Sequence, residues 1–409
     1  MNAQRKIVVV GGGPAGVFAA IGARKQNPAA AVTLLTEEAC EPYEKPPLSK
    51  AVLLGKSAPH DAPIAGPQGL AGHGVTLALD TTCRAIDRAA QAALTASGGR
   101  FPYDALVVAT GSLVREIPRL PPGMPRVHYL RTEAQARALA AELRASQHLV
   151  VIGGGLIGLE VAASAAELGL AVTVIEMMPR ILARVCDEET GARIAAAHRA
   201  RGVDIRVDTA LASAVVLPDG RNAITTGSGE TIAADLVVVG TGAKPDDRLA
   251  AAAGIACDNG IVVDENCRTS DPAIFAAGDV VRFPGSHGLV RREDWRHAQD
   301  QGTVAGHNAA GASETYRSVP SFWSEQYDLY LQGVGWQPPH PSARVRRPLG
   351  GSAQLSFELD GPRLAYAAGI NAQREIAIAR RLIERRVPVD AGELADPTKP
   401  LAAMLKARV

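Results

Sequence analysis

Two short glycine-rich stretches have the spacing of a dinucleotide-binding loop. In GGGPAG, residues 11–16, the glycines Gly11, Gly13 and Gly16 fit the pattern GxGxxG. The first glycine of such a loop allows a tight turn, the second lets a pyrophosphate approach the backbone, and the third lets a helix pack on a strand. The helix that follows offers unbonded N–H groups to the phosphates. These residues therefore predict a phosphate cradle.

The same spacing recurs about a third of the way into the chain. In GGGLIG, residues 153–158, the glycines are Gly153, Gly155 and Gly158. The chain thus contains an internal repeat, and it predicts a second dinucleotide site.

Both loops lie between segments that read as strands and helices. An apolar, β-branched run precedes each loop, an alanine-rich helix follows it, and a second strand comes next. This order predicts two βαβ units and an α/β fold. In the first unit the three segments are 7–10, 17–25 and 31–37, and in the second unit they are 149–152, 159–168 and 171–176.

A carboxylate at the end of the second strand binds ribose hydroxyl groups in such units. Glu176 occupies that place in the second unit. Its charge favours NADH, since it would repel the extra phosphate of NADPH, although Arg180 and Arg184 follow closely and weaken this preference. In the first unit the corresponding residues are Glu37 and Glu38.

Two dinucleotide sites in one chain predict a redox relay. A flavin accepts a hydride and releases single electrons, whereas a pair of nicotinamides has no such one-electron step. We therefore expect the second loop to bind the hydride donor and the first loop to bind the flavin.

Composition restricts the other function classes. The chain has 409 residues, enough for two or three domains, with 43 basic and 42 acidic side chains. This balance argues against nucleic acid or a membrane surface as a partner, and no apolar run is long enough to span a bilayer.

The five cysteines form no CxxC or CxxxxC pair and no metal-ligand pattern. We expect a cytoplasmic protein without a bound metal.

The end of the chain has a different pattern. Strand-like runs at 103–111 and 234–242 close the two units, and proline-rich stretches follow them. From about residue 320 short strands with Trp, Tyr and Gly turns appear, followed by a helix near 373–386. This pattern predicts a third domain of the α+β class.

Several longer motifs make the prediction more specific. Together they resemble the FAD-dependent NADH:ferredoxin reductases of Rieske dioxygenase and haem-thiolate monooxygenase systems, the putidaredoxin reductase and biphenyl dioxygenase ferredoxin reductase type, over nearly the whole chain. The motifs PPLSK and FWSEQYDL are the most specific. In order, the matching stretches are PYEKPPLSK (42–50), VVATG (107–111), YLRT (129–132), GGGLIGLEVAASA (153–165), FAAGD (275–279), WRHAQDQG (295–302) and FWSEQYDLYLQGVG (322–335).

The resemblance implies a glutathione reductase-like fold. It has two Rossmann-like domains and a C-terminal α+β domain. The FAD-binding domain would comprise residues 1–113 and 243–319, the NAD-binding domain residues 114–242, and the C-terminal domain residues 320–409.

The resemblance also implies the binding residues. Those for FAD are Gly11, Gly13, Pro14, Ala15, Gly16, Glu37, Lys50, Cys83, Thr110, Gly111, Arg131, Gly278, Asp279 and Trp295. Those for NADH are Gly153, Gly155, Leu156, Ile157, Gly158, Glu176 and Gly242.

Three residues are candidates for catalysis. Lys50 and Glu160 would meet where the nicotinamide lies on the flavin, because a buried ammonium near the ring stabilises developing charge and requires a carboxylate partner. The alternative is a solvated loop lysine and a glutamate on a helix surface. Trp323 would lie between the flavin and the partner protein, or else in an ordinary core, which is our interpretation of its neighbour Phe322.

The activity implied is electron transfer from NADH through FAD to a small acidic [2Fe–2S] ferredoxin that feeds a terminal oxygenase. Arg291, Arg292, Arg296 and Arg317 are candidates for a basic rim that meets this partner. His297 stands where the family commonly has Asn, and we expect it to face solvent rather than tune the flavin.

Alternatives remain open. They are an NADH oxidase, a reductase of rubredoxin or another acceptor, and a flavoprotein resembling apoptosis-inducing factor. Cys40 lies where some of these enzymes carry a redox cysteine, but the motif around it differs, so we interpret it as a structural or surface residue. A monomer and a homodimer both fit the sequence.

Overall fold

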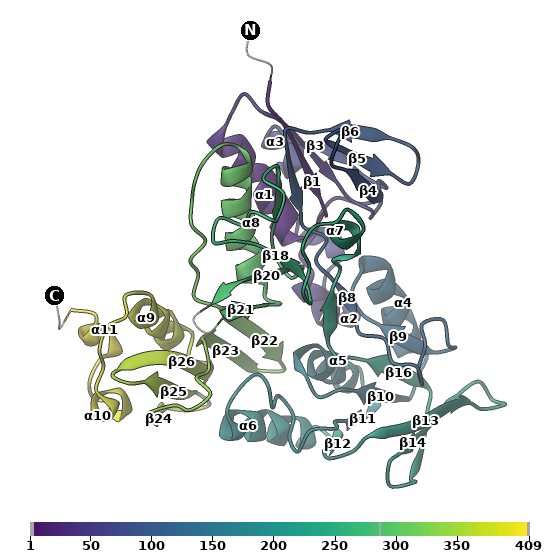
Figure 1. Cartoon of the computed structure of the whole chain (residues 1–409). Helices are drawn as coiled ribbons and strands as arrows, with labels where there is room; N and C mark the ends of the chain where they lie inside the picture. The colour runs from purple at the N-terminus through teal and green to yellow at the C-terminus, as the bar shows by residue number, and fades with distance from the viewer. Residues whose placement is uncertain (1–3, 286–287, 407–409) are drawn as a thin grey trace. The chain divides into compact units, whose positions relative to one another are not determined.

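The computed structural model describes residues 4–285 and 288–406, and it divides into two compact units (Figure 1). The first unit comprises Met1–Glu44, Pro59–Leu113 and Ala243–Pro320. The second comprises Lys45–Ala58, Val114–Gly242 and Ser321–Val409. Each unit is therefore assembled from three separate segments of the chain.

A five-stranded parallel sheet forms the centre of the first unit. Consecutive strands β1, β2 and β3 lie side by side, whereas β7 and β19 join the sheet from later in the chain. The apolar run of the β1 strand is buried on both faces. In spatial order they are β19 (Ile274–Ala276), β7 (Ala105–Val108), β1 (Lys6–Val10), β2 (Ala31–Leu35) and β3 (Thr76–Ala78).

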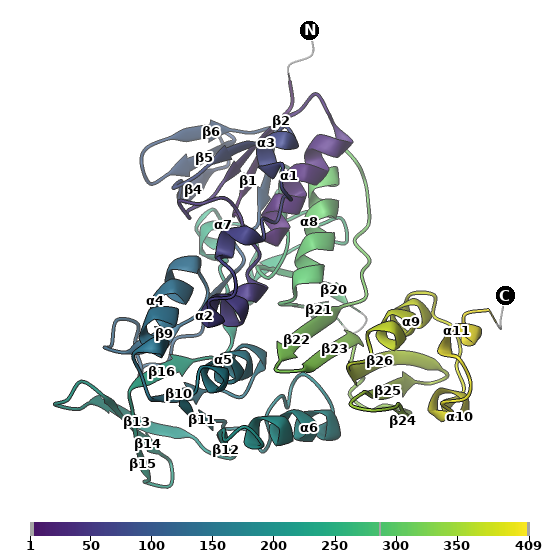
Figure 2. The same ribbon diagram turned by 180° about the vertical axis from the view of Figure 1, so that it is seen from behind.

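Two long helices of the first unit, α1 (Pro14–Gln26) and α8 (Trp295–Ala309), lie side by side in both views (Figures 1 and 2). Glycines make this contact possible. A Cβ atom on Gly302 would lie 2.2 Å from the carbonyl oxygen of Ala15, and one on Gly306 would lie 2.1 Å from that of Ala19. Only glycine allows backbones to approach so closely.

Smaller elements complete the first unit. They are an antiparallel sheet of β4 (Cys83–Asp87), β5 (Ala92–Thr95) and β6 (Arg100–Pro102), a second small sheet of β18 (Ile261–Val262), β20 (Val281–Gly285) and β21 (Gly288–Val290), and the short helices η2 (Pro59–Asp61), α3 (Gly69–Gly72) and α7 (Arg248–Ala252). Strands β8 (Ser112–Val114) and β17 (Ala243–Pro245) lie where the chain passes from one unit to the other.

The second unit repeats the parallel sheet. Its order is β12 (Asp204–Arg206), β11 (Ala171–Ile175), β10 (His148–Ile152), β16 (Leu236–Val239) and β9 (Val127–Tyr129). The unit also contains η1 (Pro46–Ser49), α2 (Ala51–Leu54), α4 (Glu133–Arg144), α5 (Leu156–Glu167) and α6 (Glu188–Arg199), and a meander of β13 (Leu211–Val216), β14 (Asn222–Thr226) and β15 (Thr231–Ala234).

The C-terminal segment of the second unit forms an antiparallel sheet with helices. The strand order is β22 (Ser321–Gln326), β23 (Leu329–Gly335), β26 (Arg363–Ile370), β25 (Gln354–Asp360) and β24 (Ala343–Pro348), and the helices are α9 (Gln373–Glu384), α10 (Ala391–Ala395) and α11 (Leu401–Met404). Two parallel sheets with flanking helices and an α+β segment confirm the predicted fold class. The three-domain boundaries stay a prediction.

Candidate functional site

The glycine loop of the first unit has the geometry of a phosphate cradle. Gly11 has φ +118°, and a Cβ atom on it would lie 2.1 Å from the carbonyl oxygen of Ala109. A Cβ on Gly16 would lie 1.9 Å from the oxygen of Gly11. A Cβ on Gly13, by contrast, would meet no atom within 4 Å. The first and third glycines are thus required by packing, while the second faces open space at the start of the α1 helix.

The loop of the second unit has the same three features. Gly153 has φ +109°, and a Cβ on it would lie 2.5 Å from the oxygen of Gly240. A Cβ on Gly158 would lie 2.1 Å from the oxygen of Gly153, and one on Gly155 would meet nothing within 4 Å. The repeat seen in the sequence is therefore a repeat of three-dimensional geometry.

Glu176, at the end of the β11 strand, is fixed against this second loop. Its Oε2 atom accepts a hydrogen bond of 2.6 Å from the N–H of Gly154, and its Oε1 atom accepts one of 2.7 Å from the N–H of Met178. The guanidinium group of Arg180 donates to the carbonyl oxygens of Ala183, at 3.2 Å, and Cys186, at 2.8 Å. This arrangement leaves a carboxylate, rather than the Arg180 cation, beside the loop.

Two exposed apolar side chains accompany the second loop. Ile157 lies in the first turn of the α5 helix and is 47% exposed, and Met177 directly follows Glu176 and is 68% exposed. Large apolar side chains with this exposure commonly mark a binding surface. We expect them to contact the flat ring of a nucleotide base.

Replacement of the Glu176 carboxylate is expected to weaken NADH binding and to reduce discrimination against NADPH. For Glu176→Ala we expect KM for NADH to rise about tenfold, since hydrogen bonds to a charged group contribute about 1.5–3 kcal/mol. Steady-state kinetics with both nucleotides check this. An unchanged ratio of kcat/KM for NADH and NADPH would contradict the role.

A second group of polar residues surrounds the start of the α8 helix in the first unit. The N–H of Gly278 donates to Oε1 of Gln301 at 2.9 Å, and Ser112 Oγ donates to Oδ2 of Asp279 at 3.0 Å. The Nε2 atom of Gln301 is buried without a hydrogen-bond partner among the described residues. A Cβ on Gly278 would lie 2.7 Å from the Cβ of Ala15, next to the first glycine loop. The open cradle and the unsatisfied amide together fit a bound dinucleotide.

Trp295 opens the α8 helix and is tied to the same unit. Its indole Nε1 donates a hydrogen bond of 2.5 Å to Oε2 of Glu44, and its ring makes an edge-on contact with Phe18, with centroids 6.0 Å apart. Burial raises the pKa of the Glu44 carboxyl group. The Glu44 carboxyl group therefore fixes the orientation of the Trp295 ring. The sequence analysis did not identify Glu44 as a functional residue.

His297 corrects one prediction. It does not face solvent, because the side chain is 1% exposed and its ring stacks on Phe283 with centroids 4.9 Å apart. Its Nδ1 atom shares a hydrogen bond of 2.7 Å with the hydroxyl of Tyr316. Burial, with a smaller contribution from the charge of Arg292, lowers its pKa to about 3. Helical periodicity places this position on the packed face of α8, and that was the overlooked signal.

This buried histidine predicts a loss of stability in acid. Between its ordinary pKa of 6.5 and the folded-state value of about 3, the unfolded chain binds a proton that the folded chain does not. The free energy of unfolding should therefore fall as pH falls through this window, by up to about 1.4 kcal/mol per pH unit. Urea unfolding at pH 7 and pH 5 checks this. His297→Asn should reduce the pH dependence, whereas replacement of the exposed His340 by Asn should leave it as in the parent.

The predicted pair of Lys50 and Glu160 is formed, within the second unit. Lys50 lies between the η1 and α2 helices, and its Nζ atom is 3.0 Å from Oε2 of Glu160 on the α5 helix. The Glu160 carboxylate also accepts hydrogen bonds from the hydroxyls of Ser49 and, at 2.7 Å to Oε1, Ser324. Glu160 is 2% exposed. The alternative that Glu160 is a surface residue is therefore wrong.

Comparison with known proteins agrees with this geometry. The model of the pyridine nucleotide-disulphide oxidoreductase family matches residues 5–302, and a reductase C-terminal model matches residues 321–405. The chain belongs to the pyridine nucleotide-disulphide oxidoreductase family. FAD and NAD(H) are the cofactors of this family, and the resemblance stated from the motifs is confirmed.

Two relatives are similar to this oxidoreductase over nearly their whole length. One is rhodocoxin reductase of Rhodococcus erythropolis, 39% identical over 393 residues, which cover 95% of this chain and 92% of that protein. Another is the ferredoxin–NAD(+) reductase component of the anthranilate 1,2-dioxygenase system of Burkholderia cepacia, 40% identical over 403 residues, 97% of this chain and 98% of that one. Among solved structures, the covalent putidaredoxin reductase–putidaredoxin complex matches with a TM-score of 0.93 and 34% identity over 99% of each chain.

The other predicted FAD ligands of the oxidoreductase fall in both units. Glu37 is exposed just after β2, Cys83 begins β4, and Thr110 Oγ1 donates to the carbonyl oxygen of Asp246 at 2.7 Å. Arg131, half-buried before the α4 helix, belongs to the second unit, as Lys50 does. Gly111, predicted for FAD, has a φ of +71°, and Gly242, predicted for NADH, has a φ of +101°.

Trp323 lies on the β22 strand of the second unit and is partly buried. Its neighbour Phe322 packs against the apolar cluster beneath the parallel sheet, which confirms the core interpretation for Phe322. The choice between core and interface for Trp323 stays a prediction.

The predicted basic rim is balanced by acids. Arg291 pairs with Glu293, Nε of Arg292 lies 3.3 Å from Asp294, and Nε of Arg296 lies 3.0 Å from Asp300. Each of the three guanidinium groups thus has a carboxylate beside it. These three residues form a set of local ion pairs rather than a patch of one charge.

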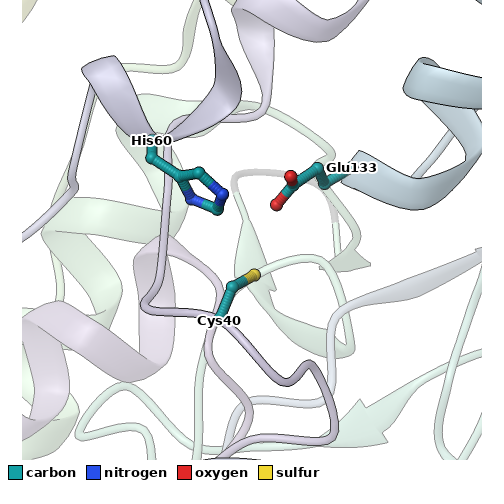
Figure 3. Close-up of side chains that lie close together, drawn as sticks. All are labelled: Cys40, His60 and Glu133. Carbon is teal, nitrogen blue, oxygen red and sulfur yellow. The ribbon is translucent and has the colours of Figure 1, made fainter.

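Cys40 lies beside a cavity of about 310 Å³ in the first unit, lined also by Tyr43, His60 and Pro63. The Cys40 thiol and the His60 ring point toward one another, and Sγ lies within 4.8 Å of a ring nitrogen (Figure 3). Glu133, drawn in the same figure, belongs to the second unit. The first unit alone therefore contributes two of these three candidate ligand atoms.

Proposed function

We propose that this chain transfers electrons from NADH, through FAD, to a small acidic [2Fe–2S] ferredoxin that feeds a terminal oxygenase. The observation that carries the proposal is the duplicated cradle, one open glycine loop in each unit, with the Glu176 carboxylate at the second loop. The similarity of the whole chain to ferredoxin–NAD(+) reductase components supports the same activity.

In this proposal the first unit holds FAD. Bound FAD would supply hydride acceptance and one-electron release. The loop at Gly13 would take the pyrophosphate, while Asp279 and Trp295 would hold the part of the cofactor near the α8 helix. The other first-unit residues proposed for FAD are Gly11, Pro14, Ala15, Gly16, Glu37, Cys83, Thr110, Gly111 and Gly278.

The second unit would bind NADH, with the loop at Gly155 on the pyrophosphate and Glu176 on the adenosine ribose. Gly153, Leu156, Ile157, Gly158 and Gly242 complete the proposed site. Lys50 and Arg131, which belong to the second unit, are also proposed FAD ligands. Trp323 would lie on the route to the partner protein.

The Lys50 ammonium supplies positive charge where negative charge develops during hydride transfer. A buried ammonium is costly without a partner. The Glu160 carboxylate compensates it, and two serine hydroxyls satisfy the remaining capacity of that carboxylate. This compensation is needed because the Lys50 side chain is only 16% exposed.

The described thiols give little support to disulfide chemistry. All five cysteines are reduced, and burial raises the pKa of Cys186 to about 12 and also raises that of Cys267. Reactive cysteines need a lowered pKa, because the thiolate is the nucleophile. The alternatives of an NADH oxidase, a rubredoxin or other acceptor reductase, and a flavoprotein like apoptosis-inducing factor are less favoured.

None of the helices formed by residues 4–285 and 288–406 has the length and apolar character needed to span a bilayer. We propose a cytoplasmic location, with a monomer or a homodimer as the assembly. We also propose the three domains 1–113 with 243–319, 114–242 and 320–409.

Steady-state turnover of the FAD-loaded protein with NADH tests the activity. A [2Fe–2S] ferredoxin, oxygen and an oxidised disulfide should be offered as separate acceptors. We expect kcat/KM to be highest with the ferredoxin. Faster consumption of oxygen or disulfide than of ferredoxin would contradict the proposal.

A further inference from the structure

A continuous series of buried side chains leads away from the Glu160 carboxylate. Nε2 of Gln326 donates to the Ser324 hydroxyl at 3.0 Å, and that hydroxyl donates to Oε1 of Glu160 at 2.7 Å. On the other side, Oε1 of Gln326 lies 2.8 Å from Nε2 of His198. Gln326 and His198 are 1% and 0% exposed. All of these residues belong to the second unit, but they come from the helices α5 and α6 and the strand β22.

The donors in this series all point toward Glu160. The carbonyl oxygen of an amide only accepts, so the Nε2 atom of His198 must carry the proton. Burial lowers the pKa of His198 and keeps the ring neutral, so its Nδ1 atom accepts from the Tyr327 hydroxyl at 3.0 Å. The series ends at the guanidinium group of Arg201, which lies 4.1 Å from the centre of the Tyr327 ring.

We propose that Gln326 and His198 are positioning residues, which fix the Glu160 carboxylate through Ser324 and thereby fix the Lys50 ammonium. Ser324 is the only partner of the Oε1 atom of Glu160 among the described residues. Because the Gln326 amide donates to the Ser324 oxygen, the Ser324 proton is directed to Glu160. Without the Gln326 amide, the Ser324 hydroxyl is no longer directed at Glu160. The Glu160 carboxylate can then rotate about its Cγ–Cδ bond, and the Lys50 ammonium moves with it.

The inference rests on the proposed function, in which Lys50 assists reduction of the flavin by NADH. Its test compares two buried glutamines that both join the C-terminal sheet to the α6 helix. Gln326 is joined to Glu160 by hydrogen bonds through Ser324. Gln354, on the β25 strand, instead donates to the Thr190 hydroxyl at 3.4 Å and is not part of this series. Gln354 is 8% exposed. Gln354→Leu is therefore a matched control for Gln326→Leu.

The first measurement is stopped-flow reduction of the FAD-loaded protein by saturating NADH, with calorimetric titration of NAD+ and thermal unfolding of each variant. We expect Gln326→Leu to reduce the rate about tenfold while the Kd for NAD+ stays within about twofold. Gln354→Leu should keep the parental rate at a similar unfolding temperature. A parental rate in Gln326→Leu, or an equal loss of rate in Gln354→Leu, would overturn the inference.

Two further variants address the possibility that Gln326→Leu does not fold. His198→Phe keeps a ring but removes the N–H donor, and it should slow reduction; His198→Gln keeps a donor and should restore most of the rate. Equal rates for these two variants would overturn the role of His198.

A second readout does not depend on turnover. Nitrogen-15 NMR of histidine-labelled protein should show His198 as the neutral tautomer protonated at Nε2, and Gln326→Leu should shift its resonances. The opposite tautomer would overturn the direction of the series. Failure of the parent to be reduced by NADH would instead refute the proposed function, and the NMR result would separate this outcome from failure of the inference alone.

Discussion

Replacement of Lys50 by alanine is expected to slow reduction of the bound flavin by NADH about a hundredfold, the usual effect of removing one charged or hydrogen-bonding group that stabilises a transition state. The Lys50 ammonium is a positive charge held 3.0 Å from a carboxylate that is almost fully buried. It is therefore fixed in place rather than mobile in water. Stopped-flow absorbance of the oxidised flavin after mixing with NADH measures the effect directly.

One control variant and two measurements separate this effect from damage to the fold. Lys56→Ala removes an exposed lysine whose Nζ atom lies 3.4 Å from Glu167, and it should leave the rate unchanged. Lys50→Ala also leaves the Glu160 carboxylate buried without its cation, so some loss of stability is expected. Thermal unfolding and flavin content should therefore be measured for each variant. A parental reduction rate in folded, yellow Lys50→Ala would end the proposed role.

The second large effect is expected at the two middle glycines, and it should separate the two cofactors. A Cβ atom at Gly13 or Gly155 would meet no protein atom within 4 Å, and neither glycine has a positive φ, so we expect the fold to tolerate valine. The valine methyl groups would instead occupy the space that a pyrophosphate needs. Gly13→Val should give folded, colourless protein. Gly155→Val should remain yellow and lose at least about a hundredfold in NADH affinity.

Absorbance spectra, circular dichroism and NADH titration of the two variants check this. Gly16→Val provides a contrast, since its Cβ would lie 1.9 Å from a backbone oxygen and the protein should misfold. A yellow Gly13→Val with normal flavin content would show that the first loop does not hold FAD.

Much of the fold could be predicted from local sequence patterns. The β-branched runs before each glycine loop became the central strands β1 and β10, and the helices expected after the loops at 17–25 and 159–168 are α1, Pro14–Gln26, and α5, Leu156–Glu167. These elements were predictable because apolar periodicity and glycine turns act within a few residues. The division of segment 45–58 into the second unit was not predictable, since it depends on contacts between segments far apart in the chain.

The site was predicted less completely. The pair of Lys50 and Glu160 came from family motifs, and the structure brings the two side chains together. Ser324 and Gln326 lie inside a quoted motif, but nothing in their spacing showed that they join Glu160 to His198. His297 was misplaced because its contacts come from segments outside the α8 helix. Its ring stacks on Phe283 and shares a hydrogen bond with Tyr316, and these contacts bury it.

The close contact between the α1 and α8 helices has a consequence for biosynthesis. The α1 helix begins at residue 14, and its partner ends at residue 309. A nascent chain that has left the ribosome only as far as the second glycine loop exposes the face of α1 that Gly302 and Gly306 later cover. Completion of the first unit must wait for most of translation, because its α8 helix, Trp295–Ala309, is synthesised late. If the first loop holds the flavin, as proposed, we expect the flavin to bind there only late in synthesis.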